Sequence, residues 1–94
     1  MAVFAVEYRY ADQPAAVTEH RPAHRAFLQN LLTKGFVLAA GAYIDQPAGA
    51  LLVLRGDSAE DVATILDDDP FAHLGLITNR QIRPWSAAIG PWAG

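Results

Sequence analysis

The order in which two hydrophobic periodicities alternate along the chain limits the folds open to it. Apolar and polar residues alternate with period two from Ala2 to Tyr10, which is typical of a half-buried strand. Further strands are expected at residues 36–43, 50–55 and 76–83, and helices at residues 22–33 and from Ser58 to a stop at Pro70. The predicted order of elements is therefore βαββαβ.

This order matches the ferredoxin-like split βαβ motif, an α+β fold. Right-handed crossovers then predict an antiparallel sheet of strand order 4-1-3-2 with both helices on one face. A chain of 94 residues is long enough for one domain, so residues 1–94 are assigned to a single domain.

Two of the predicted strands are apolar on both faces. The segments Phe36–Ala40 and Leu51–Leu54 do not alternate, so both faces of the sheet should be covered. Because the two predicted helices cover only one face, we expect the other face to pack on a second copy of the chain. The sequence therefore predicts a homodimer or higher homo-oligomer.

Composition excludes several classes of function. A net charge of −3 provides no basic field for nucleic acid, and the absence of cysteine excludes a disulfide scaffold, a thiolate metal site and a thiol nucleophile. No apolar run approaches the roughly 20 residues that span a bilayer. The N-terminus does not resemble a signal peptide, so we expect a cytoplasmic protein without nucleic-acid or membrane partners.

The histidine at position 24 opens an apolar stripe on the first predicted helix, and this stripe is expected to face the core. Its members are His24, Phe27, Leu28, Leu31 and Leu32. The predicted topology brings the start of this helix and the run Asp67–Asp69 to one rim of the sheet, with Tyr8, Tyr10 and Gly41. Pro70 favours an extended conformation for Asp69, which turns its carboxylate inward. A carboxylate beside a histidine fixes the imidazole tautomer, an arrangement suited to acid–base catalysis.

Simpler interpretations of these residues stay open. A half-buried histidine often has no catalytic role, and Arg21 either binds an anionic substrate at the helix N-terminus or pairs with Glu19 or the Asp cluster. His20 and His24 have the i, i+4 spacing of two metal ligands, but Pro22 lies between them. Although His73 and Asp69 would be further ligands, we expect neither a metal nor another cofactor.

Five short segments spread over nearly the whole chain resemble the YciI-like (YCII-related) family. They are Arg21-Pro22-Ala23-His24, Gly35 with the strand ending in Ala40-Gly41, Asp69-Pro70-Phe71, Gly75-Leu76, and Ile82-Arg83-Pro84-Trp85. The resemblance implies a ferredoxin-like fold that dimerises through its sheets, as in dimeric α/β barrels. It also implies an active site on a histidine–aspartate pair, which corresponds to His24 and Asp69. His73 departs from the small residue expected before Gly75-Leu76.

Together these features predict a small-molecule enzyme of the hydrolase, dehalogenase or isomerase type that acts on small cyclic or aromatic compounds. A relative in the resembled family acts on chlorinated hydroquinones. His24 would be the acid or base, and Asp69 would orient it or act as a nucleophile in hydrolytic dehalogenation. Substrate contacts are expected from Arg21, Tyr8, Gly41 and Phe71. The alternative is a non-catalytic ligand-binding or accessory domain.

Overall fold

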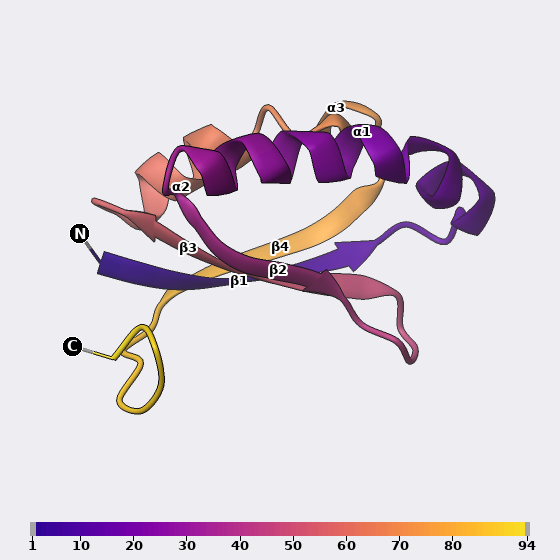
Figure 1. Ribbon diagram of the computed structural model, residues 1–94. Helices are drawn as coiled ribbons and strands as arrows, with labels where there is room; N and C mark the ends of the chain where they lie inside the picture. Colours follow the sequence, from indigo (N-terminus) through magenta and orange to yellow (C-terminus); the bar gives the residue numbers. More distant parts are fainter. Residues whose placement is uncertain (1, 94) are drawn as a thin grey trace.

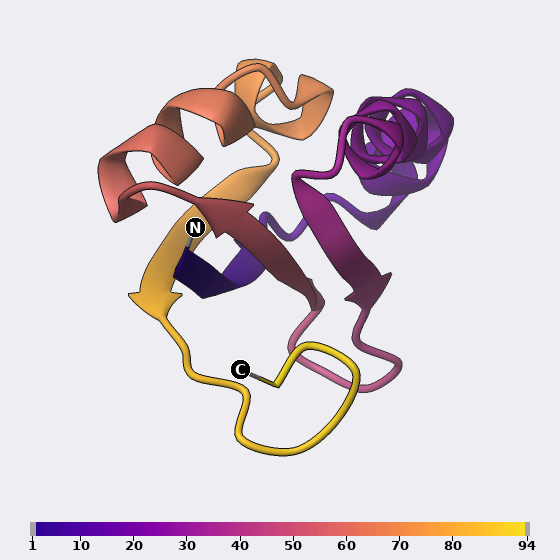
Figure 2. The same ribbon diagram turned by 60° about the vertical axis from the view of Figure 1, so that its left-hand side comes forward.

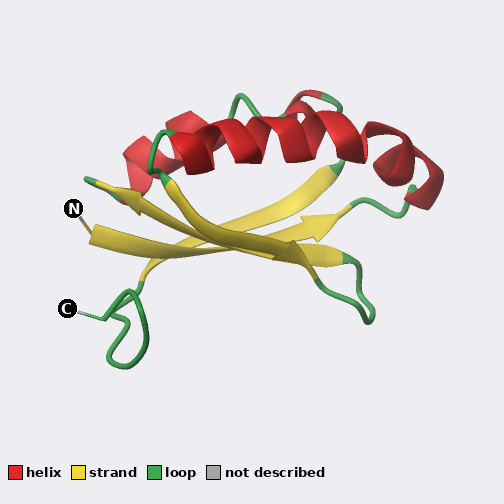
Figure 3. Cartoon of the chain, in the orientation of Figure 1, coloured by secondary structure: helices red, strands yellow, loops and turns green. Residues whose placement is uncertain are grey.

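The fold is one antiparallel sheet with helices on a single face (Figures 1 and 3). The computed structural model describes residues 2–93. Its elements are β1 (Ala2–Tyr10), α1 (Pro14–Thr33), β2 (Val37–Ala42), β3 (Gly49–Gly56), α2 (Ala59–Leu66), α3 (Pro70–His73) and β4 (Ile77–Pro84).

The sheet has the predicted topology. Its strand order is β2-β3-β1-β4, and every neighbouring pair is antiparallel. The α+β class and the ferredoxin-like arrangement are therefore confirmed. The two crossovers place α1 beside β2 and the α2–α3 segment beside β4, as the rotated view in Figure 2 shows. No helix within residues 2–93 is long and apolar enough to cross a membrane.

The core lies between the sheet and the helices. The alternating pattern predicted for β1 is confirmed, since every second residue is buried on the helix-facing side. These residues are Phe4, Val6, Tyr8 and Tyr10. Leu52 and Leu54 of β3 point the same way and belong to the same core cluster, which also takes in apolar residues of all three helices. This burial of apolar surface is the main stabilising contribution to the fold.

The first helix is eight residues longer at its N-terminus than predicted. We expected the helix to begin at Pro22, but α1 begins at Pro14 and Pro22 lies inside it. Pro14 occupies the first turn, where the missing N–H has no intrahelical partner to lose, and Val17 is buried in the core. An internal proline removes one backbone hydrogen bond, and Figure 1 shows the first turns of α1 bent away from the rest. The helix ends at Thr33, as predicted, and Gly35 follows with a φ of +86°.

The structure contains a third helix that the sequence analysis did not predict. Helix α2 ends at Leu66, and Pro70 does not stop it but opens the four-residue helix α3. His73 is the last residue of α3. Ser58 caps the N-terminus of α2, because its hydroxyl accepts a hydrogen bond from the Asp61 N–H at 3.1 Å.

Within residues 2–93 no helix covers the other face of the sheet. Residues after β4 fold back on this side, as Figures 1 and 2 both show. Ala87 in this tail is buried, whereas Leu51 of β3 keeps 42% of its surface exposed. The face therefore retains exposed apolar surface, which we call the open face.

Candidate active site

The structure brings His24 and Asp69 together, although 45 residues separate them in the chain. His24 lies on α1, and Asp69 caps the N-terminus of α3. Nδ1 of His24 is 2.9 Å from both Oδ1 and Oδ2 of Asp69, and both side chains are buried. This is the contact expected of a histidine oriented by a carboxylate.

The backbone of Asp69 explains why its carboxylate points inward. Its φ and ψ are −60° and 128°, the extended conformation that a following proline favours. In this conformation Oδ1 accepts a hydrogen bond from the Phe71 N–H at 2.9 Å. Oδ2 accepts a second one from the Tyr8 hydroxyl at 3.1 Å. With His24, three donors therefore surround a carboxylate that is 0% exposed.

This network fixes the tautomer of His24. Because Tyr8 and Phe71 both donate to Asp69, the carboxylate is an acceptor, and the hydrogen-bond network assigns the proton shared with His24 to Nδ1. Nε2 of the neutral ring then carries a free lone pair. Within residues 2–93 every fully buried side-chain nitrogen or oxygen has a hydrogen-bond partner, and His24 forms its bonds through Nδ1. Nε2 is therefore not fully buried.

Two aromatic rings hold the imidazole in place. Phe71 stacks on His24 with ring centroids 4.0 Å apart and planes inclined by 4°. Tyr10 packs against Phe71 in a T-shaped arrangement, with ring centroids 5.4 Å apart and planes inclined by 83°. A stacked ring restricts rotation of the imidazole about its χ2 angle and so keeps Nε2 in one direction.

Tyr8 is a permanent donor to Asp69. Burial raises the pKa of the Tyr8 hydroxyl far above its usual value, and the negative charge of Asp69 raises it further. The phenol therefore keeps its proton at any pH at which the protein would work.

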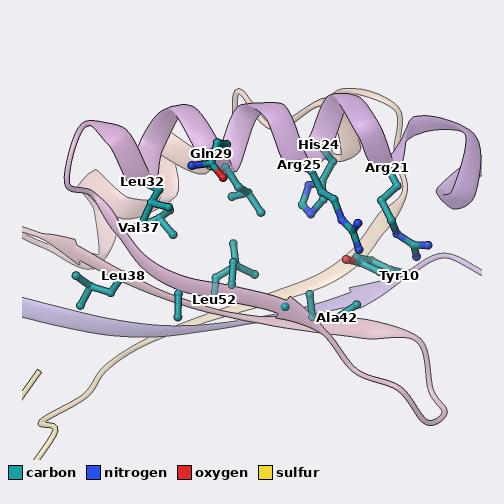
Figure 4. Close-up of a pocket in the computed structure, with 15 residues that line it drawn as sticks. Tyr10, Arg21, His24, Arg25, Gln29, Leu32, Val37, Leu38, Ala42 and Leu52 are labelled. Atoms are coloured by element: carbon teal, nitrogen blue, oxygen red, sulfur yellow. The ribbon is translucent and has the colours of Figure 1, made fainter. Parts of the chain in front are cut away.

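A pocket opens beside His24, between α1 and the edge strand β2 (Figure 4). Its volume is about 460 Å³, within the range of small-molecule sites. Its walls come from one face of α1, from β2, from the first half of β3 and from Tyr10 at the end of β1. His24 lines this pocket, and its Nε2 is not fully buried. Of the two ring nitrogens of His24, Nε2 is therefore the one that a bound molecule could reach.

The predicted substrate residues divide into two groups. Arg21 and Gly41 line the pocket, as expected of residues that contact a ligand. Tyr8 and Phe71 do not line the pocket. Tyr8 bonds to Asp69, and Phe71 stacks on His24. Their positions are those of supporting residues rather than of ligand contacts.

Sequence reasoning overlooked two polar residues of the pocket, Arg25 and Gln29. It also assigned Leu32 to the core, whereas Leu32 is 45% exposed and lines the pocket. The spacing of Arg21, Arg25, Leu28 and Leu32 at intervals of four, three and four residues was a usable signal, because such residues share one helix face.

No metal site is apparent in the described part of the chain. Residues 2–93 contain no group of three or more His, Asp or Glu side chains placed to hold an ion. His20 lies on the same helix as His24, but its nearest acidic partner is Glu19, at 3.6 Å.

Comparison with known proteins identifies the family. A family model for the YCII-related domain matches residues 1–86. The chain belongs to this family. No curated protein matches the sequence.

Two solved structures share the fold. The first is 5-chloro-2-hydroxyhydroquinone dehydrochlorinase from Burkholderia phenoliruptrix in complex with 2,5-dihydroxybenzoquinone, with a TM-score of 0.78 and 19% identity over 89% of this chain and 93% of that chain. The second is an antibiotic biosynthesis monooxygenase, with a TM-score of 0.58 and 14% identity over 93% and 98% of the two chains. At these identities the likeness concerns the fold alone.

Proposed function

We propose that this YCII-related protein is a small-molecule enzyme in which His24 transfers protons as a general acid or base. The observation that carries the proposal is that the two ring nitrogens of His24 have different surroundings. Nδ1 is bound by the buried carboxylate of Asp69, while Nε2 belongs to a side chain that lines the pocket. Such an arrangement gives a base of fixed direction within reach of a bound molecule.

Asp69 acts in this proposal as the residue that orients His24. Its carboxylate is 0% exposed, accepts three hydrogen bonds and does not line the pocket. A nucleophile must approach the substrate within about 3–3.5 Å before reaction. The orienting role therefore fits its position better than the nucleophilic role considered from the sequence.

Small cyclic or aromatic compounds are the proposed substrates. A pocket of about 460 Å³ accommodates one ring with its substituents. The dehydrochlorinase of similar fold binds 2,5-dihydroxybenzoquinone, a compound of this size. Net loss of HCl from a chlorinated hydroquinone requires that a proton be removed and that chloride leave with the bonding electrons. Nε2 of His24 would accept that proton, and the same group would serve an isomerase or hydrolase.

The proposed assembly is a homodimer or higher homo-oligomer in which a second copy covers the open face. The exposed apolar surface of Leu51 on a sheet face without helices supports this. A cytoplasmic location stays a prediction from the sequence.

The test compares His24→Gln with His20→Gln. His20 lies one turn earlier on α1 and is outside the pocket, so it is a matched control. Wild-type protein is incubated with 5-chloro-2-hydroxyhydroquinone, with other halogenated phenols and with small lactones, and chloride release or ring opening is measured. We expect His24→Gln to lose about 10²- to 10⁴-fold in kcat/KM on any compound turned over, and His20→Gln to keep its activity.

Full activity of His24→Gln would overturn the assignment of the base. Binding of 2,5-dihydroxybenzoquinone without turnover of any compound by the wild type would favour the non-catalytic ligand-binding domain instead.

A further inference from the structure

The face of α1 that lines the pocket changes character along its length. Arg21 and Arg25 occupy its N-terminal part, and Leu28 and Leu32 its C-terminal part. Figure 4 shows this polarity directly, with Arg21 and Arg25 at one end of the pocket, beside Tyr10, and Leu32 at the other. A molecule lying along α1 would therefore meet two cations at one end and apolar side chains at the other.

The cationic end of the pocket is not neutralised by an ion pair among the described residues. No Asp or Glu lines the pocket, and neither Arg21 nor Arg25 forms an ion pair within residues 2–93. Arg80 shows the contrast, because its guanidinium lies 3.0 Å from Asp67. Two arginines one helical turn apart, facing a pocket without carboxylates, are suited to bind an anion from outside.

Tyr10 adds a neutral donor at the same end. Burial raises the pKa of its hydroxyl, an effect that the nearby Arg21 and Arg25 charges only partly offset. The hydroxyl therefore stays protonated at neutral pH and does not compete with a bound anion as a negative group. The titratable and charged groups that line this pocket are Tyr10, Arg21, His24 and Arg25.

The opposite end is apolar and open. Leu28, Leu32, Val37 and Leu52 contribute its side chains, and Leu32 is exposed although its neighbours are buried. Arg25 and Leu32 are seven residues apart, a separation of about 10 Å along a helix axis. That length fits one ring with a short apolar substituent. His24, one residue before Arg25, lies between the two ends near the cationic one.

We propose that the pocket selects a small organic anion with an acidic group, a carboxylate or an ionised phenol, held by Arg21 and Arg25, and an apolar body that lies along Leu28 and Leu32. The inference rests on the proposed function in one respect, which is that this pocket is the substrate site. It goes further because it names Arg25 as a specificity-determining residue. It also states the orientation of the bound molecule along α1.

The test is a binding measurement that needs no turnover. Isothermal titration of the whole protein uses three probes: 4-propylbenzoate, its uncharged analogue 4-propylbenzamide, and benzoate, which lacks the apolar substituent. The variants are Arg25→Gln, the double variant Arg21→Gln/Arg25→Gln, and Leu32→Gln. Arg83→Gln removes an exposed charge on β4, outside the pocket, and is the control.

We expect 4-propylbenzoate to bind at least about tenfold more tightly than 4-propylbenzamide, since hydrogen bonds between two charged groups are stronger than those to a neutral amide. The double variant should lose this preference, with Arg25→Gln between it and the wild type. Leu32→Gln should weaken 4-propylbenzoate and leave benzoate unchanged. Arg83→Gln should behave as the wild type.

Equal affinity for the acid and the amide, or loss of affinity in Arg83→Gln as large as in Arg25→Gln, would overturn the proposal. The same titration on His24→Gln separates it from the proposed function. If His24→Gln still prefers the acid and still turns over substrate, only the catalytic role of His24 is wrong. If turnover depends on His24 but the wild type does not prefer the acid over the amide, only the inference about the anion is wrong.

Discussion

The ring of His24 lies almost parallel to that of Phe71, with planes inclined by 4° and centroids 4.0 Å apart. Phe71 is two residues from Asp69, and its own N–H donates to the Asp69 carboxylate. One short segment, the start of α3, therefore supplies both the anion that binds Nδ1 and the surface on which the imidazole rests. The proposed base is positioned by two neighbours of one turn rather than by separate parts of the fold.

Replacing the stacking ring should lower the catalytic rate as well as the stability of the fold. Phe71→Leu keeps an apolar side chain of similar size but removes the flat surface under His24. We expect a loss of about 1–2 kcal/mol in the free energy of unfolding and a fall of about tenfold in kcat with KM little changed. Phe27→Leu, on a partly buried phenylalanine of α1 outside the pocket, is the control. A fall in kcat that is equal in the two variants would argue against a positioning role.

The Asp69 carboxylate should be important for stability as well as for orientation. Asp69→Ala leaves the Tyr8 hydroxyl, the Phe71 N–H and Nδ1 of His24 without their buried acceptor. We expect a loss of about 3–5 kcal/mol in the free energy of unfolding, measured by urea denaturation. Asp68→Ala is the matched control, because Asp68 is exposed, and its effect should stay within about 0.5 kcal/mol. Similar losses in both variants would contradict the network described here.

Tyr8 should make stability fall at alkaline pH. Its pKa is raised in the folded protein, so the unfolded chain releases the Tyr8 proton from about pH 10 while the folded protein keeps it. The unfolded state therefore binds fewer protons, and the contribution of Tyr8 is fully present below about pH 10 and declines above it. Tyr8→Phe lacks this decline.

The measurement is the free energy of unfolding of wild type and Tyr8→Phe at neutral pH and above about pH 10. The variant should be less stable by about 1–2 kcal/mol at neutral pH, and the difference should shrink by up to about 1.4 kcal/mol per pH unit in the alkaline range. Tyr43→Phe removes an exposed tyrosine that bonds to Glu7 at 2.7 Å, and it should show a much smaller change. Parallel curves for wild type and Tyr8→Phe would show that Tyr8 ionises equally in both states.

The sequence was sufficient to predict the sheet order and the meeting of His24 with Asp69. Both follow from the order of elements and from the handedness of the crossovers, which do not depend on side-chain detail. The inward turn of Asp69 was predictable too, because Pro70 restricts its backbone locally.

Other features depended on packing that periodicity does not contain. The early start of α1 was missed because Pro22 resembles a helix start, whereas burial of Val17 and a bend keep the helix continuous through it. Helix α3 has four residues, too few to show a period. Leu32 was assigned to the core because a helix face that lines a pocket and one that meets a core have the same apolar spacing. The two kinds of helix face differ in whether a gap separates the helix from the neighbouring strand. Only the structure shows that such a gap lies between α1 and β2.

The proposed assembly makes a prediction about two exposed leucines. Leu51 on the open face is 42% exposed and Leu74, after α3 on the helical side, is 49% exposed, so they are similar as isolated surface residues. If a second copy covers the open face, Leu51→Lys buries a charge at the interface, whereas Leu74→Lys leaves the charge in water. We expect sedimentation velocity at micromolar concentration to show an oligomer for wild type and Leu74→Lys, and a shift towards monomer for Leu51→Lys. A stable wild-type monomer would contradict the assembly, and dissociation caused by Leu74→Lys alone would place the interface on the helical side instead.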